Sequence, residues 1–179
     1  WRESPMDRLE PGEQLATMAS LLHRDQAGIP FVSALIRRSG LPARRWLMEY
    51  LHTYLVPVLH CFYAYRLAFM PHGENLILVL RNGVPVRALM KDIGEEIIVM
   101  ADKMELPRDV ARIRVDVPAE EQVLSIYTDV IDCFFRFLAA VLHEDGQLTQ
   151  DEFWDTVAEV VRAYQAERPE LAEDFAAHD

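Results

Sequence analysis

The chain has 179 residues, of which 51% are hydrophobic and 26% charged, a composition typical of one folded domain with a substantial core. Its formal net charge of −11 excludes non-specific binding to nucleic acid, which needs a basic surface to neutralise phosphate groups. The most apolar segment, 123–142, is interrupted by Asp129, Asp132 and Arg136, so the sequence predicts no membrane span.

The N-terminus and the two cysteines indicate the setting of the chain. Residues 1–11 begin with Trp1 and carry two prolines, which predicts a connector arriving from an upstream part of a longer protein. Cys61 and Cys133 lie in apolar helical patterns, which favours buried free thiols in a reducing compartment. We therefore expect a cytoplasmic protein.

Helices are predicted for most of the first 65 residues. Apolar residues recur at three- and four-residue steps in three segments, 12–24, 29–38 and 42–65. Pro30 near the start of the second segment and Gly40 just beyond its end are typical helix boundaries. Pro57 lies inside the third segment and predicts a kink or a break there, because proline removes a backbone donor.

The apolar period changes between residues 68 and 100. Two apolar runs, 76–80 and 84–90, flank Asn82-Gly83, and this dipeptide suits a type I′ turn in which both central residues need a positive φ. The pattern predicts a hairpin of two adjacent antiparallel strands. Since both runs are almost continuously apolar, we expect helices on both faces of the hairpin.

Two further helices are predicted in the C-terminal third. One begins after Pro118, where acids lie in the first turn, and runs to about His143. The segment 149–152, Thr-Gln-Asp-Glu, is typical of a capping box at the start of the next helix, which ends before Pro169. The sequence therefore predicts a mainly α fold with a small antiparallel β-hairpin, in the α+β class.

The residues with chemical potential lie in the two loops at one end of the hairpin. His72, Glu74 and Asn75 precede its first strand, and Lys91 and Asp92 follow its second strand, so we expect them to lie close together. Asparagine and aspartate oxygens are ligands that Mg²⁺ takes beside phosphate oxygens, and a histidine or lysine can neutralise charge on a phosphate. The alternative interpretation is a polar turn with a surface ion pair.

Two other functions stay open on these residues. The order His72, Asn75, hairpin, Asp92 is typical of a kinase-like phosphotransferase lobe, although Gly73 and Glu74 stand where such enzymes carry a catalytic aspartate. A non-catalytic helical interaction module is the second possibility.

Two motifs resemble a known enzyme family. Residues 70–75, Met-Pro-His-Gly-Glu-Asn, and 91–96, Lys-Asp-Ile-Gly-Glu-Glu, are similar to the C-terminal, FhuF-like part of siderophore synthetases that work without a nonribosomal peptide synthetase, the IucA/IucC family. Segments 46–52 and 133–137 resemble the desferrioxamine-type members. The resemblance covers nearly the whole chain. It also raises a ferric-siderophore reductase, but such a protein would need about four cysteines for an iron–sulfur centre, and the chain has 2. The resemblance implies a cupped-hand fold, in which residues 1–117, with the 76–91 hairpin, form part of the palm and residues 118–179 a helical thumb.

The resemblance also implies an activity, siderophore biosynthesis by an ATP- and Mg²⁺-dependent ligase. Such an enzyme activates a carboxylate as its acyl-adenylate and condenses it with an amine or hydroxylamine to form an amide. On this mapping His72 contacts the phosphates or the adenylate, Asn75 and Asp92 hold Mg²⁺, and Glu74 lines the nucleotide site. Lys91, where the family often has arginine, supplies a catalytic cation near the phosphates.

The resemblance implies partners as well. An upstream half of the enzyme supplies further phosphate- and adenine-contacting residues, so we expect this piece alone to be inactive, and the family commonly forms homodimers. Met70 stands where citrate-activating relatives often have glutamate, which favours a preformed or succinylated hydroxamate over free citrate. Arg66 stands where a small residue, usually glycine, is expected.

Two other polar groups have less specific interpretations. Asp129 and Asp132 lie one turn apart on the predicted helix, and they face either a substrate cleft or a partly exposed edge. Four arginines surround a Gly-Leu-Pro turn and either guide an anionic substrate or lie in solvent at helix ends: Arg37, Arg38, Arg44 and Arg45.

Overall fold

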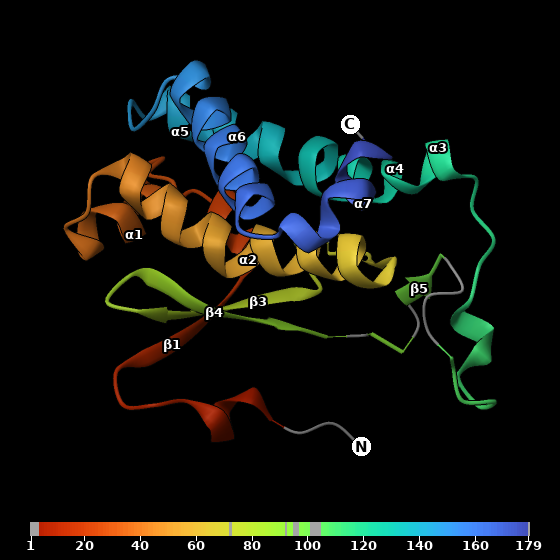
Figure 1. Cartoon of the computed structure of the whole chain (residues 1–179). Helices are drawn as coiled ribbons and strands as arrows, with labels where there is room; N and C mark the ends of the chain where they lie inside the picture. The colour runs from red at the N-terminus through yellow and green to blue at the C-terminus, as the bar shows by residue number, and fades with distance from the viewer. Residues whose placement is uncertain (1–3, 72, 92, 95–96, 101–104, 179) are drawn as a thin grey trace.

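A layer of α-helices covers one face of a small antiparallel sheet (Figure 1). The structure is a computed structural model, and it describes residues 4–71, 73–91, 93–94, 97–100 and 105–178. In chain order its elements are η1 (Pro5–Arg8), β1 (Glu13–Thr17), η2 (Met18–Leu22), α1 (Phe31–Ser39), α2 (Ala43–Tyr65), β2 (Leu67–Phe69), β3 (Leu76–Arg81), β4 (Val84–Met90), β5 (Ile97–Val99), η3 (Ala111–Ile113), α3 (Ala119–Gln122), α4 (Leu124–Ile126), η4 (Tyr127–Phe135), α5 (Arg136–Glu144), α6 (Gln150–Ala166), η5 (Pro169–Leu171) and α7 (Ala172–Ala176). The predicted α+β class is confirmed.

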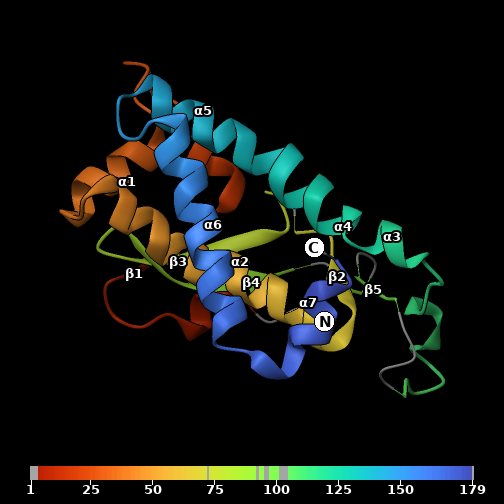
Figure 2. The same cartoon turned by 45° about the horizontal axis from the view of Figure 1, so that its top comes forward.

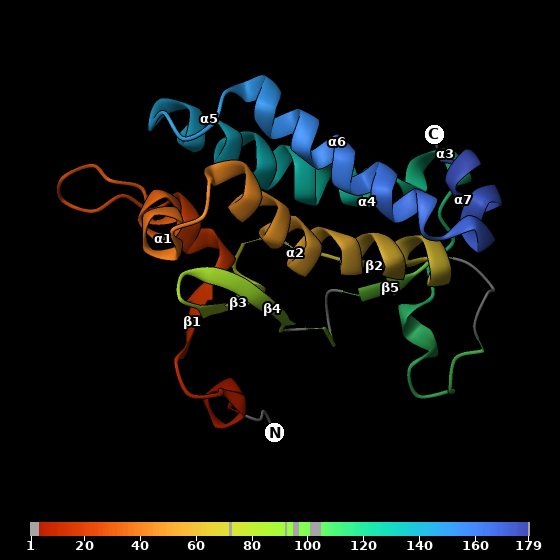
Figure 3. The ribbon, with the colours of Figure 1, turned by 60° about the vertical axis from the view of Figure 1, so that its left-hand side comes forward.

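The main sheet has three strands in the order β1-β3-β4. The predicted helix at 12–24 is wrong, because Glu13–Thr17 pairs antiparallel with β3 and helical structure, of the 3-10 type, begins only at Met18. The edge of β3 supplies backbone hydrogen-bond partners to this segment, and such tertiary pairing overrides a weak local preference. The expectation of helices on both faces is also wrong, since the α-helices of the described chain lie on one face (Figures 1 and 3).

The predicted hairpin is confirmed, and its tip is docked on the helices. Asn82 and Gly83 have φ values of 52° and 82°, as a type I′ turn requires. Trp46 of α2 donates its indole N–H to the Gly83 carbonyl over 2.7 Å. A Cβ at Gly83 would lie 2.7 Å from the Leu35 carbonyl oxygen, so close packing against α1 also demands glycine. The turn therefore fixes the sheet against both helices.

A second sheet, β2 paired with β5, was not predicted from the sequence. It begins directly after Arg66, the residue that ends α2 in the left-handed conformation with φ 51° and ψ 33°. Glycine is the usual residue at such a helix end, which explains why a small residue is expected there. The Arg66 side chain is buried, lies over the Phe62 ring, and pairs with Asp174 of α7 over 2.7 Å.

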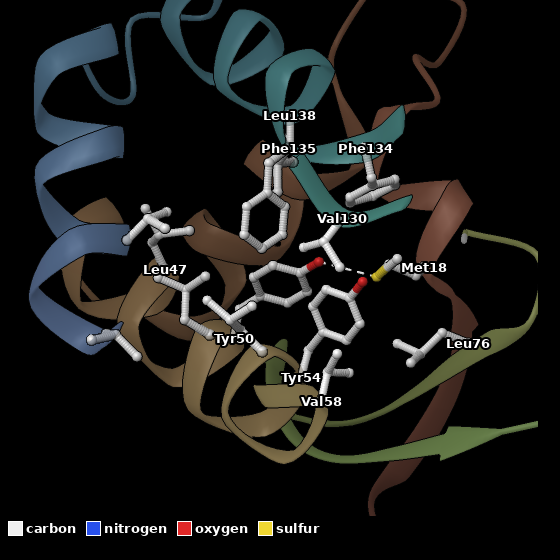
Figure 4. Close-up of a cluster of buried hydrophobic side chains, with 14 of the residues drawn as sticks. Met18, Leu47, Tyr50, Tyr54, Val58, Leu76, Val130, Phe134, Phe135 and Leu138 are labelled. Atoms are coloured by element: carbon white, nitrogen blue, oxygen red, sulfur yellow. Dashed lines mark hydrogen bonds between the residues drawn. The ribbon is translucent and has the colours of Figure 1, made fainter. Parts of the chain in front are cut away.

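The core is built around α2, which continues through Pro57 without a break. Tyr50 and Tyr54 project from α2 toward Phe135 of η4, and Tyr50 donates its hydroxyl to the sulfur of Met18 over 3.0 Å (Figure 4). The same hydrophobic cluster takes in residues of the sheet and of the C-terminal helices. One core thus includes residues of both 1–117 and 118–179. The expected division of the chain into a palm portion and a thumb stays a prediction.

The C-terminal helices pack across α2. The predicted helix after Pro118 is present as a run of helical segments from α3 to α5, which includes the nine-residue π-helix η4. The capping box of Thr149 and Glu152 is confirmed at the start of α6, which crosses α2 (Figure 2).

Cys133 is exposed, so the prediction of a buried thiol is wrong there, whereas Cys61 is half-buried. Within the described residues, no helix is long and apolar enough to cross a membrane.

Candidate functional site

The loop before β3 is held in place by hydrogen bonds to two distant elements. Tyr54 of α2 donates its hydroxyl to the Pro71 carbonyl over 3.1 Å, and the Ala19 N–H of η2 donates to the Gly73 carbonyl over 2.9 Å. A Cβ at Gly73 would lie 2.9 Å from both Cα and Cβ of Ala19, which is closer than real carbon contacts. The close approach of this loop to η2 therefore requires glycine.

Asn75 and Lys91 join the two loops at the base of the hairpin. The Lys91 N–H donates to the Asn75 carbonyl over 2.9 Å, and its ammonium Nζ donates to Asn75 Oδ1 over 3.2 Å. Asn75 is 4% exposed, so its side chain has a fixed position. The predicted meeting of the two loops is thus observed for this pair.

Of the remaining predicted site residues, the structure describes Glu74 but not His72 or Asp92. Glu74 is an exposed turn residue between Gly73 and Asn75. His72 and Asp92 lie outside the described residues, so their predicted roles stay predictions.

The described side chains fit a phosphate that carries magnesium better than a bare metal ion. They offer one buried amide oxygen, on Asn75, and one ammonium group, on Lys91, that lies against it. An isolated cation at this oxygen would be repelled by the ammonium group, whereas a magnesium-bound phosphate could use both groups at once. Among the described residues, no three or more His, Cys, Asp or Glu side chains are grouped so as to hold a metal ion.

A pocket of about 260 Å³ lies beside this loop, between the small sheet β2-β5 and the start of the helical run α4-η4. Asp129 of η4 lines this pocket, and its interpretation as a residue of a substrate cleft stays a prediction. Asp132, by contrast, is half-exposed and pairs with Arg136 over 3.2 Å. Ser125 and Thr128 also line the pocket, and no pattern in the sequence distinguished these two hydroxyls.

Burial of Tyr54 raises its pKa well above the ordinary value, and the nearby carboxylate of Asp129 raises it further. The Tyr54 hydroxyl therefore stays protonated and keeps donating to the Pro71 carbonyl. Tyr54 therefore lies near the carboxylate of Asp129 and is hydrogen-bonded to the loop before β3, whose described residues 70–71 and 73–75 are called the motif loop below.

The four arginines around the Gly-Leu-Pro turn are exposed and interact with polar groups at the surface of the described chain. Each has a polar partner: Arg37 with Asp145, Arg38 with Gln14, Arg44 with Glu159 and Arg45 with Glu49. Ion pairs of this exposed kind contribute about 0–1 kcal/mol each, which favours the solvated interpretation.

Known proteins are similar to the chain over its whole length. Residues 44–179 match the protein family described as "Ferric iron reductase FhuF-like transporter". The chain is 49% identical to putrebactin synthase of Shewanella sp. (strain MR-4), over 100% of this chain and 28% of that protein. It is 32% identical to the rhizobactin siderophore biosynthesis protein RhbF of Rhizobium meliloti (strain 1021), over 100% of this chain and 30% of that protein. The chain thus spans less than a third of the length of these relatives.

Solved structures share the fold. Aerobactin synthetase IucC from a hypervirulent pathotype of Klebsiella pneumoniae matches with a TM-score of 0.94 and 30% identity, over 100% of this chain and 34% of that chain. The ATP-bound aerobactin synthetase IucA of that pathotype matches with a TM-score of 0.70 at 19% identity, over 88% of this chain and 30% of that chain, which shows a common fold.

These relatives confirm the resemblance to the IucA/IucC synthetases that the two motifs indicated. The narrower likeness to desferrioxamine-type members stays a prediction. The chain therefore belongs to the ferric iron reductase FhuF-like transporter family, in the form that occurs within siderophore synthetases.

Proposed function

We propose that the chain is the C-terminal portion of a siderophore synthetase, an ATP-dependent ligase that adenylates a carboxylate and joins it to an amine or hydroxylamine. The observation that carries this proposal is the Asn75–Lys91 pair, a buried amide oxygen and an ammonium group held 3.2 Å apart at the motif loops. The names of the similar proteins support a synthetase, and the ATP-bound structure of one of them supports ATP as the co-substrate.

The residues of this chain would act mainly on the phosphates. As a carboxylate oxygen bonds to the α-phosphorus and pyrophosphate leaves, the Lys91 ammonium would neutralise developing negative charge. Asn75 Oδ1, with Asp92 as the second proposed ligand, would hold the magnesium ion, which would supply positive charge beside the phosphates. His72 would contact the phosphates or the adenylate, and Glu74 would line the nucleotide site. An amine nitrogen would then displace AMP from the acyl carbon.

The tethers of the loop would supply positioning. Tyr54 and Ala19 donate hydrogen bonds to the carbonyls of Pro71 and Gly73, so these two residues of the loop have fixed positions. A catalytic group that is preorganised in this way loses less entropy when the reaction begins. Gly73 would serve this purpose by its lack of a side chain.

The remainder of the site would lie in other parts of the protein. The chain spans 28% of putrebactin synthase, and we propose that an upstream half contributes the other contacts to adenine and phosphate. The piece alone would be inactive, and the full protein would act as a homodimer in the cytoplasm. The inactivity of the piece is tested by comparing the activity of the full-length protein with that of the isolated piece.

The decisive experiment measures ATP–pyrophosphate exchange and amide formation by the full-length protein, with a succinylated hydroxamate as the acyl donor. Lys91→Met removes the charge but keeps the chain length, and we expect exchange to fall on the order of 10²-fold. Lys91→Arg keeps a cation and should retain most of the activity. Arg45→Met, at an exposed ion pair with Glu49, is the control that should change nothing. Exchange by Lys91→Met at the wild-type rate would overturn the proposal.

The family description raises ferric iron reduction as a second candidate. An iron–sulfur centre takes about four cysteine ligands, whereas the chain contains 2, one half-buried and one exposed. A kinase-like phosphotransferase remains the other enzymatic alternative, and the products discriminate it. A ligase of the proposed kind releases AMP and pyrophosphate, whereas a phosphotransferase releases ADP.

A further inference from the structure

The pocket beside the motif loop has an apolar side and a mixed side. Ala68 and Phe69 of β2, Met70 directly after it and Ile98 of β5 form the apolar side. The mixed side comes from α4 and η4, far away in the sequence, and it carries the polar groups of Asp129, Thr128 and Ser125 beside the apolar Leu124. The ribbon of α4 lies beside β2 and β5 (Figure 2). At about 260 Å³ the pocket has room for roughly eight groups of the size of a water molecule, at about 30 Å³ each.

The charge of the lining selects the kind of ligand. Asp129 is the one ionisable side chain among the described residues that line the pocket. A carboxylate in a partly apolar pocket repels an anion and attracts a cation, and the net charge of −11 gives the whole chain the same preference. The carboxylate substrate and the phosphates of ATP are anions, so they are disfavoured here, whereas an alkylammonium ion matches both sides of the pocket.

The local backbone at Asp129 is unusual. The nine residues of η4 form a π-helix, although the helical segments before and after it are of the α type. π-Helical segments are rare and often occur at functional sites, because their wider turn changes the direction of side chains. Val130, the next residue, is fully buried in the core, so the backbone that carries Asp129 is firmly packed.

The pocket is directly connected to the motif loop. Met70 lines the pocket and is followed at once by Pro71, whose carbonyl accepts the hydroxyl of Tyr54. A ligand in the pocket would therefore lie next to the loop that the proposed function assigns to the adenylate. This is where a nucleophile must lie to reach an activated acyl carbon.

We infer that this pocket binds the amine substrate of the synthetase by one end, as an alkylammonium ion at Asp129, with its methylene chain against Ala68, Met70 and Ile98. The nitrogen at the other end, uncharged, is then the nucleophile that attacks the activated acyl carbon and releases AMP. The inference rests on the proposed function and adds the location and the binding residues of the nucleophile. Thr128 supplies a hydroxyl beside the charged end. Linear diamines and their N-hydroxy derivatives have the required combination of an ammonium group and an apolar chain.

The test uses Asp129→Asn in the full-length protein, with linear diamines of increasing length and their N-hydroxy derivatives as nucleophiles. Loss of a charge-assisted hydrogen bond corresponds to about 1.5–3 kcal/mol, so we expect the KM for the amine to rise about 10- to 100-fold. ATP–pyrophosphate exchange, which needs no amine, should stay near the wild-type rate and reports that the variant is folded. Asp129→Glu keeps the charge and should recover part of the affinity.

The matched control is Asp132→Asn, the same substitution one turn along the same helix, where the carboxylate is half-exposed and pairs with Arg136. It should leave the KM for the amine unchanged. An unchanged KM in Asp129→Asn, or a rise in the KM for the acyl donor instead, would overturn the inference and leave the proposed function standing. Absence of exchange in the wild-type protein with any carboxylate would overturn both.

Discussion

Arg66 ends α2 in the left-handed conformation, and its guanidinium group still reaches Asp174 of α7 over 2.7 Å. The Arg66 side chain is 8% exposed and that of Asp174 is 19% exposed, so this ion pair is largely buried. It ties the last helix of the described chain to the end of the central one. A residue that looks misplaced in the sequence thus has a structural partner.

This pair leads to a prediction about unfolding. Asp174→Ala leaves the guanidinium group buried without its anion, and breaking a buried pair costs about 3–5 kcal/mol, or somewhat less here because Asp174 retains some exposure. Arg66→Gly removes the buried charge and relieves a left-handed backbone that costs a non-glycine residue about 1–2 kcal/mol. We therefore expect Asp174→Ala to be the more destabilising change in urea unfolding of the full-length protein. Greater destabilisation by Arg66→Gly would contradict this account.

Gly73 provides a test of the loop geometry. Gly73→Ala would place its Cβ 2.9 Å from the backbone of Ala19, so the loop must move by a few tenths of an ångström or more. Because small misplacements of a catalytic loop reduce rates strongly, we expect ATP–pyrophosphate exchange to fall at least about 10-fold. Gly94→Ala is the matched control, since a Cβ there meets no atom within 4 Å. Equal rates for the two variants would argue against a positional role of this loop.

Substitutions of Tyr54 and Tyr50 can distinguish a hydrogen bond that positions the motif loop from one that only stabilises the core. Both hydroxyls are buried, but that of Tyr54 donates to the Pro71 carbonyl and that of Tyr50 to the Met18 sulfur. Each change to Phe removes one hydrogen bond and should cost about 1 kcal/mol of the free energy of unfolding. We expect only Tyr54→Phe to lower the exchange rate as well, by several-fold. The measurement pairs urea unfolding with exchange kinetics, and a rate loss in Tyr50→Phe alone would reverse the assignment.

The interactions of Glu13 predict that the free energy of unfolding depends on pH. Its carboxylate accepts the Glu10 backbone N–H over 2.9 Å and pairs with Arg87 over 2.6 Å, and these contacts, together with Arg81, lower its pKa. A lowered pKa in the folded state means that the stabilisation is present above the ordinary glutamate value, about 4.3, and is lost as the pH falls through the folded-state pKa. Glu13→Gln should be less stable at neutral pH.

The measurement for Glu13 is the free energy of unfolding between neutral pH and the acid range. The difference between wild type and Glu13→Gln should shrink as the pH falls below about 4.3. Glu49→Gln, at an exposed pair with Arg45, is the control and should show little difference at any pH. A constant difference across the range would show that the Glu13 carboxylate acts by packing rather than by charge.

Several elements could be predicted from the sequence because their causes are local. The Asn82-Gly83 turn, the proline and glycine at the ends of α1, and the capping box of Thr149 and Glu152 each depend on residues within a few positions of one another. The meeting of Asn75 with Lys91 follows from the hairpin between them. The sequence by itself therefore determined the α+β class, most helices and the place of the motif loops.

Other features were decided by the tertiary structure. β1 is a strand because β3 offers it an edge, Arg66 tolerates its backbone conformation because Asp174 lies near, and Cys133 is exposed because η4 turns it away from the core. The pocket at Asp129 combines residues 68–70, residue 98, residues 124–125 and residues 128–129, three segments that are neighbours only in space. Patterns along the chain report interactions over one or two turns of helix, whereas pairing, burial and pocket shape depend on contacts between distant segments.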